Sequence, residues 1–375
     1  MNLFLIHTPF QLFVAHQIIN YKGLKDNMAL FGYVGSNRQF YDIYDYMEIK
    51  GIFIKSFKFD NLETWALAKL HNPLRCIKDI RENYSFLKSI ISDYGVRNLY
   101  IGDINNFSCR FCAYMFGKQS IRIIFYEEGS SHYEYQRHVF KFNKVINNLL
   151  TKFYDYFLYE PVMGCNYAQW RFKEDIPYEM LPIFKRYSIL DIFHEEYDEQ
   201  IKVNLLLPPK VKQHIESEIQ RINIVNTESF LYISSPIFEE FGQLGYKLFL
   251  DFLNEYFDNT IGLHVFVKYH PRDTDKFKQD FENILKNKKI TYTILSNTIN
   301  IPLEYYLQVI HFSKMITFLS SVSFYNGYIY PYTKIEDLAM DYLQLCAKNN
   351  IPNIDMYINL YRKLSEKKEY IKKSI

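Results

Sequence analysis

Short apolar runs recur along this chain, and each is closed by turn-forming residues and followed by a stretch with helical spacing. The first apolar run is 2–7, and helical spacing occupies 10–19. Between them, Thr8 is a suitable helix N-cap and Pro9 suits the first helical position. Strands that alternate with helices predict a parallel sheet covered by helices, because parallel neighbours are joined through crossover connections.

The alternation occurs as two series. The first has expected strands at 29–34, 52–57, 96–101 and 121–126, with helices at 62–70, 73–92 and 107–116. The second has expected strands at 230–233, 263–267, 291–295 and 315–319, with helices at 209–222, 245–257, 277–286, from 302 onward and at 335–347. Helical spacing also occurs at 142–159, but 133–195 otherwise lacks a regular period. We therefore expect an α/β protein with two Rossmann-like doubly wound domains facing one cleft, at residues 1–190 and 191–350, followed by a basic helical tail at 351–375.

Composition narrows the class of protein. A chain of 375 residues is too long for one comfortable core, and a hydrophobic content of 48% is that of a globular protein. The formal net charge of +2 excludes a general nucleic-acid binder. Five scattered cysteines indicate a reducing compartment, and no stretch has the pattern of a signal peptide or a membrane span. The expected location is the cytoplasm.

One expected strand of the second series ends in a cluster of cations. Lys268, His270 and Arg272 alternate with Tyr269 and Pro271, so the three cationic side chains can lean to the same side. The proline biases the preceding histidine towards extended backbone and stops the strand. The imidazole is thereby placed at a strand's carboxyl end, where open α/β sheets bind ligands. The pattern indicates a cradle for a phosphate; the alternative is an X-Pro turn with solvated charges.

A pair of carboxylates follows another strand. Glu127, Glu128 and Gly129 come directly after the strand expected at 121–126. Adjacent side chains on an extended chain point oppositely, so one glutamate can face a substrate while the other faces structural partners. Neighbouring carboxylates raise each other's pKa, which suits a general base. The alternative is a solvated acidic turn.

Serine motifs follow two further strands. Ser234-Ser235-Pro236 and Ser320-Ser321 offer hydroxyl groups and backbone N–H groups to an anion. The alternative is that they serve only as helix N-caps.

Glu304 stands near an expected helix start. It can bind ribose hydroxyls, or it can complement the helix dipole. The chain has no glycine-rich nucleotide motif and no strand-terminal D-x-D metal motif. Phosphate binding is therefore expected to rest on cations and hydroxyls, without a metal ion or cofactor.

The ordered set of motifs resembles the bacterial sialyltransferases. Glu127-Glu128-Gly129, His270-Pro271 and Ser320-Ser321 stand in the order of that group's acidic-acidic-Gly, His-Pro and serine motifs. Further similar stretches are 3–15 with Thr8 and Gln11, 231–236, 301–306 with Glu304, and 317–320. The nearest resemblance is to the lipooligosaccharide sialyltransferases of glycosyltransferase family 52, with a more distant one to the capsular polysialyltransferases. It covers roughly residues 1–345.

The resemblance implies a GT-B type, inverting, metal-independent enzyme that takes CMP-sialic acid as donor. His270, helped by Lys268 or Arg272, would neutralise or protonate the departing phosphate, and a glutamate would accept the acceptor's proton. The residues implied as catalytic are Glu127, Glu128 and His270. Those implied in substrate and CMP binding are Thr8, Gln11, Gly129, Ser234, Ser235, Pro236, Lys268, Pro271, Arg272, Glu304, Ser320 and Ser321.

The chain departs from family 52 at one position. Where that family has an acidic residue proposed as the base, this chain has Ile237, with Glu239 and Glu240 slightly beyond. The base is therefore open between Glu127/Glu128 and Glu239/Glu240, and the strand-terminal pair is favoured because it is better fixed.

The expected acceptor is a terminal sugar, galactose first, of a bacterial surface glycan such as lipooligosaccharide or capsule, with a lipid-linked acceptor included. Alternatives are a transferase for another CMP-sugar such as CMP-Kdo, a polymerising sialyltransferase, and a non-catalytic nucleotide- or glycan-binding protein. The basic stretch 363–373 predicts either contact with anionic lipid at the inner face of the membrane or a solvated terminal helix. A homodimer and a monomer are both left open.

Overall fold

The computed structural model describes most of the chain outside several connecting segments. The described residues are 1–32, 52–59, 73–102, 121–127, 183–190, 198–203, 207–220, 229–259, 263–270, 273–295, 301–318, 320–329 and 333–373, with the single positions 109, 112, 113, 116, 152, 156 and 196. They form two compact units, Met1–Asn204 and Leu205–Ile375.

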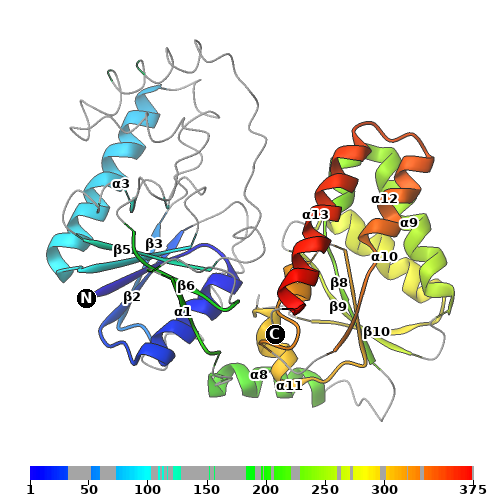
Figure 1. Cartoon of the computed structure of the whole chain (residues 1–375), viewed down its shortest axis with the longest axis horizontal. Coiled ribbons are helices and arrows are strands. Elements are labelled where there is room, and N and C mark those ends of the chain that lie inside the picture. Colours follow the sequence, from blue (N-terminus) through cyan, green and yellow to red (C-terminus); the bar gives the residue numbers. More distant parts are fainter. Residues whose placement is uncertain are drawn as a thin grey trace. The chain divides into compact units, whose positions relative to one another are not determined.

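The first unit is built on a parallel sheet. Within the described residues its strands run, in spatial order, β3 (Lys55–Phe59), β2 (Asn27–Gly32), β1 (Asn2–Ile6), β4 (Asn98–Ile101), β5 (Arg122–Tyr126), β6 (Ile183–Ser188) and β7 (Asp198–Gln200). Successive strands add to one side of β1 and then, from β4 onward, to the other, which is the doubly wound Rossmann-like order. Helices α1 (Pro9–Lys22) and α3 (Pro73–Tyr94) lie on opposite sides of this sheet (Figure 1).

Local sequence explains the first β–α step. All five residues of β1 are buried, as in a central parallel strand covered on both faces. Thr8 caps α1: its hydroxyl accepts the Gln11 N–H at 3.1 Å, and the Gln11 side-chain oxygen accepts the Thr8 N–H at 3.1 Å. Pro9 occupies the first turn, and the helix ends at Gly23, whose φ of 58° is left-handed. The expected cap and first helical residue are confirmed.

The second unit repeats the plan. Within the described residues its parallel strands run β10 (Thr291–Ile294), β9 (His264–Lys268), β8 (Ser229–Ile233), β11 (Lys314–Thr317) and β12 (Lys334–Asp337). Its α-helices are α8 (Pro209–Gln220), α9 (Gly242–Tyr256), α10 (Asp275–Asn287), α11 (Leu303–Val309), α12 (Ala339–Lys348) and α13 (Ile354–Lys373), with 3-10 turns η5 (Ile237–Phe241), η6 (Phe257–Asn259) and η7 (Ser321–Phe324). The expected α/β class with two Rossmann-like sheets is confirmed.

Aromatic rings fill the core between the second sheet and its helices. The ring of Phe249 on α9 lies 4.9 Å from that of Phe318 and 5.0 Å from that of Tyr342 on α12, both edge to face. Phe277 and Phe281 of α10 stack in the same core, and each is fully buried. Edge-to-face rings of this kind stabilise the fold by more than the burial of their apolar area alone. This core holds the carboxyl ends of β8, β9 and β11 in fixed positions.

Two strands were missed, and they move the domain boundary. β6 and β7 lie in and just after the segment that the sequence left without a period, and they extend the first sheet through pairing with β5. The first unit consequently continues to Asn204 and does not end at residue 190. A bidentate ion pair fixes the outer edge: Arg186 of β6 donates to Asp198 of β7 at 2.6 and 2.7 Å.

The end of the chain also differs from expectation. The helix expected at 335–347 begins as β12, a strand paired with β11, and becomes helical only from Ala339. The tail is helical, as predicted, but its apolar side belongs to the second core: Ile354 is buried, and Tyr357 stands edge to face with Phe241. Helix α13 packs along α12 (Figure 1).

Some expectations concern residues outside those described. The helices at 62–70 and 142–159 lie wholly outside them, and that at 107–116 lies mostly outside. The cleft between domains stays a prediction. Among the described residues, no helix has both the length and the apolar character needed to cross a membrane.

Candidate functional site

The fold of the second unit brings several predicted residues to one edge of its sheet. The strand order changes direction between β8 and β11, and ligands of open α/β sheets bind beyond the carboxyl ends at such a point. Ser234 follows β8, and Ser320 follows β11 closely. Lys268 ends the neighbouring strand β9, and its carbonyl accepts the Ser234 N–H at 2.9 Å. The serines and the His-Pro strand therefore meet at one edge, as the sequence predicted.

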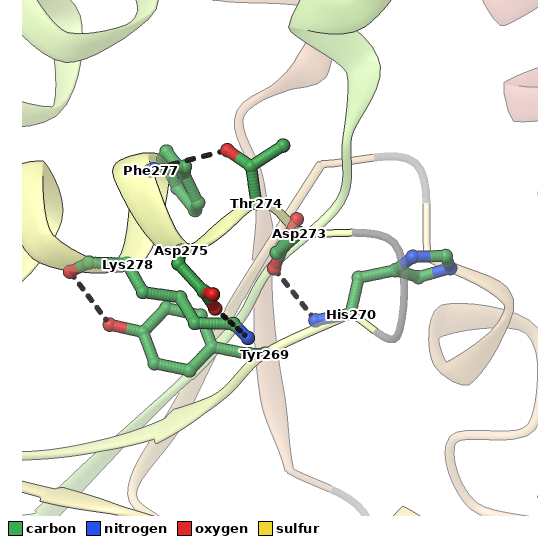
Figure 2. Close-up of polar contacts among 7 residues, drawn as sticks. All are labelled: Tyr269, His270, Asp273, Thr274, Asp275, Phe277 and Lys278. Atoms are coloured by element: carbon green, nitrogen blue, oxygen red, sulfur yellow. Dashed lines mark hydrogen bonds and ion pairs between the residues drawn. The ribbon is translucent and has the colours of Figure 1, made fainter. Parts of the chain in front are cut away.

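A tight turn fixes the backbone of His270. Its N–H donates to the Asp273 carboxylate at 2.8 Å, and the Asp273 N–H donates back to the His270 carbonyl at 2.9 Å. Figure 2 shows the imidazole turned away from this carboxylate, so the ring is not engaged by the turn itself. Thr274 then caps α10 by accepting the Phe277 N–H at 3.2 Å. The helix start and the turn together hold the histidine beyond the end of β9.

Asp273 is a residue of the site that the sequence reasoning did not single out. Its carboxylate is 5% exposed, and burial raises its pKa to about 6. The Ser234 hydroxyl and the His270 N–H partly oppose this shift in pKa, although the hydroxyl's geometry is not that of a full hydrogen bond. An aspartate that accepts a nearby backbone N–H is common turn chemistry, so its position three residues after His270 was a usable signal.

Lys268 does not extend freely towards a ligand. Its ammonium group donates to the Ile301 carbonyl at 3.2 Å and lies 5.8 Å from the centroid of the Tyr306 ring. Burial lowers its pKa to about 8, against the attraction of Glu304 and Glu218, which raises it. The cation therefore faces α11 and α8; since Arg272 lies outside the described residues, the expected cradle of three cations stays a prediction.

Glu304 is the partner that tertiary structure supplies to Lys268. It lies in the first turn of α11, is 5% exposed, and has its pKa raised to about 7 by burial, with Lys268 acting in the opposite direction. A carboxyl group with this pKa changes charge near neutrality, so binding a ligand can readily alter its protonation.

The serines stand where expected, with different exposure. The Ser320 hydroxyl accepts the Val322 N–H at 3.4 Å and so caps η7, which starts at Ser321. Ser234 is buried with its hydroxyl unpartnered among the described residues, Ser235 is half-buried, and Pro236 is buried. The hydroxyls of Ser234 and Ser320 therefore differ: the first makes no full hydrogen bond among the described residues, and the second makes only a long one.

The acidic motif lies in the first unit. Glu127 is fully buried, and its carboxylate accepts the Ile189 N–H at 2.6 Å, while its own N–H donates to the Tyr187 carbonyl at 3.1 Å. It thus fastens β5 to the end of β6. Its neighbour Glu128 lies outside the described residues, as do Gly129, Pro271 and Arg272.

The other candidate bases are on η5. Glu239 and Glu240 are exposed, and the Glu240 carboxylate accepts the Tyr357 hydroxyl of α13 at 3.1 Å. In the first unit, the Thr8 hydroxyl serves as the cap of α1, whereas the Gln11 side chain is fully buried with its NH₂ group unpaired among the described residues.

Solved structures resemble the whole chain at low sequence identity. UDP-GlcNAc 2-epimerase of Methanocaldococcus jannaschii, solved with UDP-GlcNAc and UDP, is 12% identical with a TM-score of 0.52, over 94% of this chain and 93% of that one. UDP-GlcNAc 2-epimerase of Neisseria meningitidis bound to UDP-GlcNAc is 10% identical with a TM-score of 0.47, over 99% and 92%. A glycosyltransferase from Rickettsia africae is 12% identical with a TM-score of 0.41, over 100% and 99%. The first of these supports the two-domain, GT-B type fold.

The family comparison is specific. No curated protein matches significantly. The family model of alpha-2,8-polysialyltransferase (POLYST) matches residues 2–338, nearly the whole chain. The match falls on the group that the sequence resemblance placed second, and the lipooligosaccharide type stays a prediction. The chain belongs to the alpha-2,8-polysialyltransferase family and is a sialyltransferase-type glycosyltransferase.

Proposed function

We propose that the protein transfers sialic acid from CMP-sialic acid to a terminal sugar of a bacterial surface glycan, lipooligosaccharide or capsule, with inversion and without a metal ion. The observation that carries the proposal is the turn that holds His270 beyond β9, at the same edge of the sheet as the serines that follow β8 and β11. A departing CMP phosphate needs charge neutralisation and hydrogen bonds, and an imidazole beside hydroxyl groups supplies both.

In this mechanism each residue has one task. His270 protonates or neutralises the departing phosphate while Ser320 and Ser321 bind its oxygens. Glu304 and the backbone near Ser235 hold the cytidine. The donor carbon is tertiary and develops an oxocarbenium-like charge, so the acceptor hydroxyl needs little activation beyond loss of its proton.

We assign that proton to Glu128. The carboxylate of Glu127 is engaged by the Ile189 amide, and Glu240 is engaged by Tyr357. Because adjacent side chains on an extended chain point oppositely, the assignment passes to Glu128, the other member of the strand-terminal pair. General-base catalysis of this kind contributes about 10²–10⁴-fold.

The test is release of CMP from CMP-sialic acid in EDTA, with and without a lactose acceptor. Acceptor-stimulated release that His270→Ala abolishes supports the proposal. His311→Ala, which changes an exposed histidine of the same unit, is the matched control and should leave the rate unchanged. Unchanged turnover in His270→Ala would contradict the mechanism, and CMP binding without turnover of this donor would favour another CMP-sugar.

A polymerising activity is the second candidate, and the family match favours it. Its test is the product length made from an α-2,8-linked disialyl acceptor, measured by mass spectrometry. A ladder of products indicates polymerisation, whereas a single addition indicates the simple transferase.

Membrane contact is the last part of the proposal. Met356 and Leu360 of α13 are 52% and 46% exposed, one turn apart and next to the exposed cations Arg362 and Lys363. Apolar side chains beside cations suit an anionic lipid surface, where lipid-linked acceptors lie. Co-sedimentation with phosphatidylglycerol vesicles that 0.5 M salt abolishes would support it, and equal sedimentation without vesicles would refute it.

A further inference from the structure

The first unit has unpaired polar groups at the place where its strand order changes direction. His7 follows β1 directly and is 7% exposed, yet neither ring nitrogen makes a hydrogen bond of acceptable geometry within the described residues. Gln11, one turn into α1, is fully buried, and its NH₂ group is likewise unpaired there. Buried polar atoms are nearly always paired, so unpaired ones at a sheet edge call for a ligand.

Two glycines shape this place. A Cβ on Gly32, the last residue of β2, would lie 2.0 Å from the His7 ring, and a Cβ on Gly102, just after β4, would lie 2.3 Å from the Gln11 side-chain nitrogen. β2 and β4 are the two neighbours of β1. The imidazole therefore rests over the end of one neighbour and the amide over the end of the other, and only glycine at both positions allows this.

The chemistry of the unpaired groups defines their ligand. Burial lowers the pKa of His7 to about 4, partly offset by the Gly32 backbone, so the ring is neutral and offers one donor and one acceptor. The side-chain oxygen of Gln11 is used by the His7 and Thr8 amides, which leaves two N–H donors. A neutral set of donors and an acceptor matches hydroxyl groups better than a phosphate, which cations bind.

We propose that His7 and the Gln11 NH₂ group bind hydroxyl groups of the acceptor sugar, as an acceptor subsite in the first unit. This rests on the proposed glycosyl transfer. Neighbouring strands lie about 4.8 Å apart, so groups above β2 and β4 span about 10 Å, the scale of one or two sugar residues.

The test is His7→Phe, which keeps a ring of similar shape and removes both nitrogens. We expect the acceptor KM to rise about tenfold, the effect of losing a buried hydrogen bond to substrate, with the donor KM and acceptor-independent CMP release unchanged. The melting temperature is measured beside the kinetics, because the larger phenyl ring must fit the same buried space and loses the interaction with the Gly32 backbone. His16→Phe is the matched control: His16 is 5% exposed, with its pKa also lowered to about 4, but it lies within α1 and nine residues along the chain from His7.

Two measurements separate this inference from the proposed function. If the wild type releases no CMP from CMP-sialic acid, the proposed donor is wrong, and the subsite is tested by binding alone: lactose or disialyl-lactose should shift the ¹⁵N resonances of the His7 ring. Those resonances are assigned by their absence in His7→Phe or, should that variant not fold, in His7→Asn. An acceptor KM within twofold of wild type, or unshifted His7 resonances at saturating acceptor, would overturn the proposal.

Discussion

Replacing Asp273 with asparagine removes a buried negative charge and keeps an oxygen that can accept the His270 N–H. The aspartate carboxyl is 5% exposed, and burial raises its pKa from 3.8 to about 6. A raised carboxyl pKa means that the folded chain holds the proton more tightly than the unfolded chain. The tighter proton binding of the folded chain stabilises the fold fully below pH 3.8, and this contribution is lost as the pH rises through about 6.

The size of the effect follows from this difference. Two pKa units correspond to roughly 3 kcal/mol, and about 2 kcal/mol of it is expressed between pH 4.5 and pH 8. The free energy of unfolding of Asp273→Asn, relative to wild type, should therefore increase by about 2 kcal/mol over that interval. Other titrating groups are common to both proteins and cancel in the comparison.

The readout must report the second unit. Both tryptophans, Trp65 and Trp170, belong to the first unit, so their fluorescence does not serve. Native-state hydrogen exchange of peptides from β9 and α10 does, at a series of pH values. If the difference in unfolding free energy between Asp273→Asn and wild type stays constant within about 0.5 kcal/mol from pH 4.5 to pH 8, ionisation of the buried carboxylate does not destabilise the fold and the argument is refuted.

The same residue gives an activity test. Asp273→Ala removes the acceptor of the His270 N–H and should lower kcat by about tenfold to a hundredfold, because the imidazole is no longer held in place. Asparagine should restore most of the rate. Equal losses in both variants would show that the charge, and not the turn, matters for turnover.

Three further predictions follow from buried or engaged carboxylates and from the proposed chemistry. Glu127→Gln should destabilise the first unit by about 1–3 kcal/mol, measured by tryptophan fluorescence in urea unfolding, while kcat is largely kept. Glu128→Gln should lower kcat by about 10²–10⁴-fold and leave unfolding normal. A loss of kcat in Glu127→Gln and a loss of stability in Glu128→Gln would exchange the two roles. Glu304→Gln should raise the KM for CMP-sialic acid at least about tenfold and leave the acceptor KM unchanged, because Lys268 loses its counter-charge and the cytidine loses a hydrogen-bond partner. An unchanged donor KM would exclude Glu304 from the site. Removal of metal ions with EDTA should leave the rate unchanged, and restoration of a lost rate by Mg²⁺ would contradict the metal-independent mechanism.

Local sequence was sufficient for the central part of each sheet. β1, β8, β9 and β11 lie in runs of apolar residues, since a central parallel strand is covered on both faces, and each is closed by polar or turn residues. The capping of α1 by Thr8 was readable for the same reason, because all of its partners lie within four residues. The placement of the serines and His270 at strand ends followed from this pattern.

Three polar or mixed strands could not be read in this way. β7 and β12, each at an edge of its sheet, are polar because an edge strand is covered less completely, and β6, between β5 and β7, mixes apolar and charged residues. Their pairing depends on partners far along the chain, such as the bond from Arg186 of β6 to Asp198 of β7. The domain boundary and the true start of α12 were misplaced as a result.

By itself, the sequence determined two parallel α/β units, the capped first helix, and the strand-terminal positions of the acidic, histidine and serine motifs, because these depend on short-range periodicity and turn chemistry. Only the tertiary structure decided which of these side chains are already engaged. Glu127 is held by Ile189, and Lys268 faces Glu304 across 36 residues of chain. It also revealed His7 resting on Gly32, a contact between the ends of adjacent strands. Such pairings form only when the sheet brings strand ends together, so no local pattern of residues predicts them.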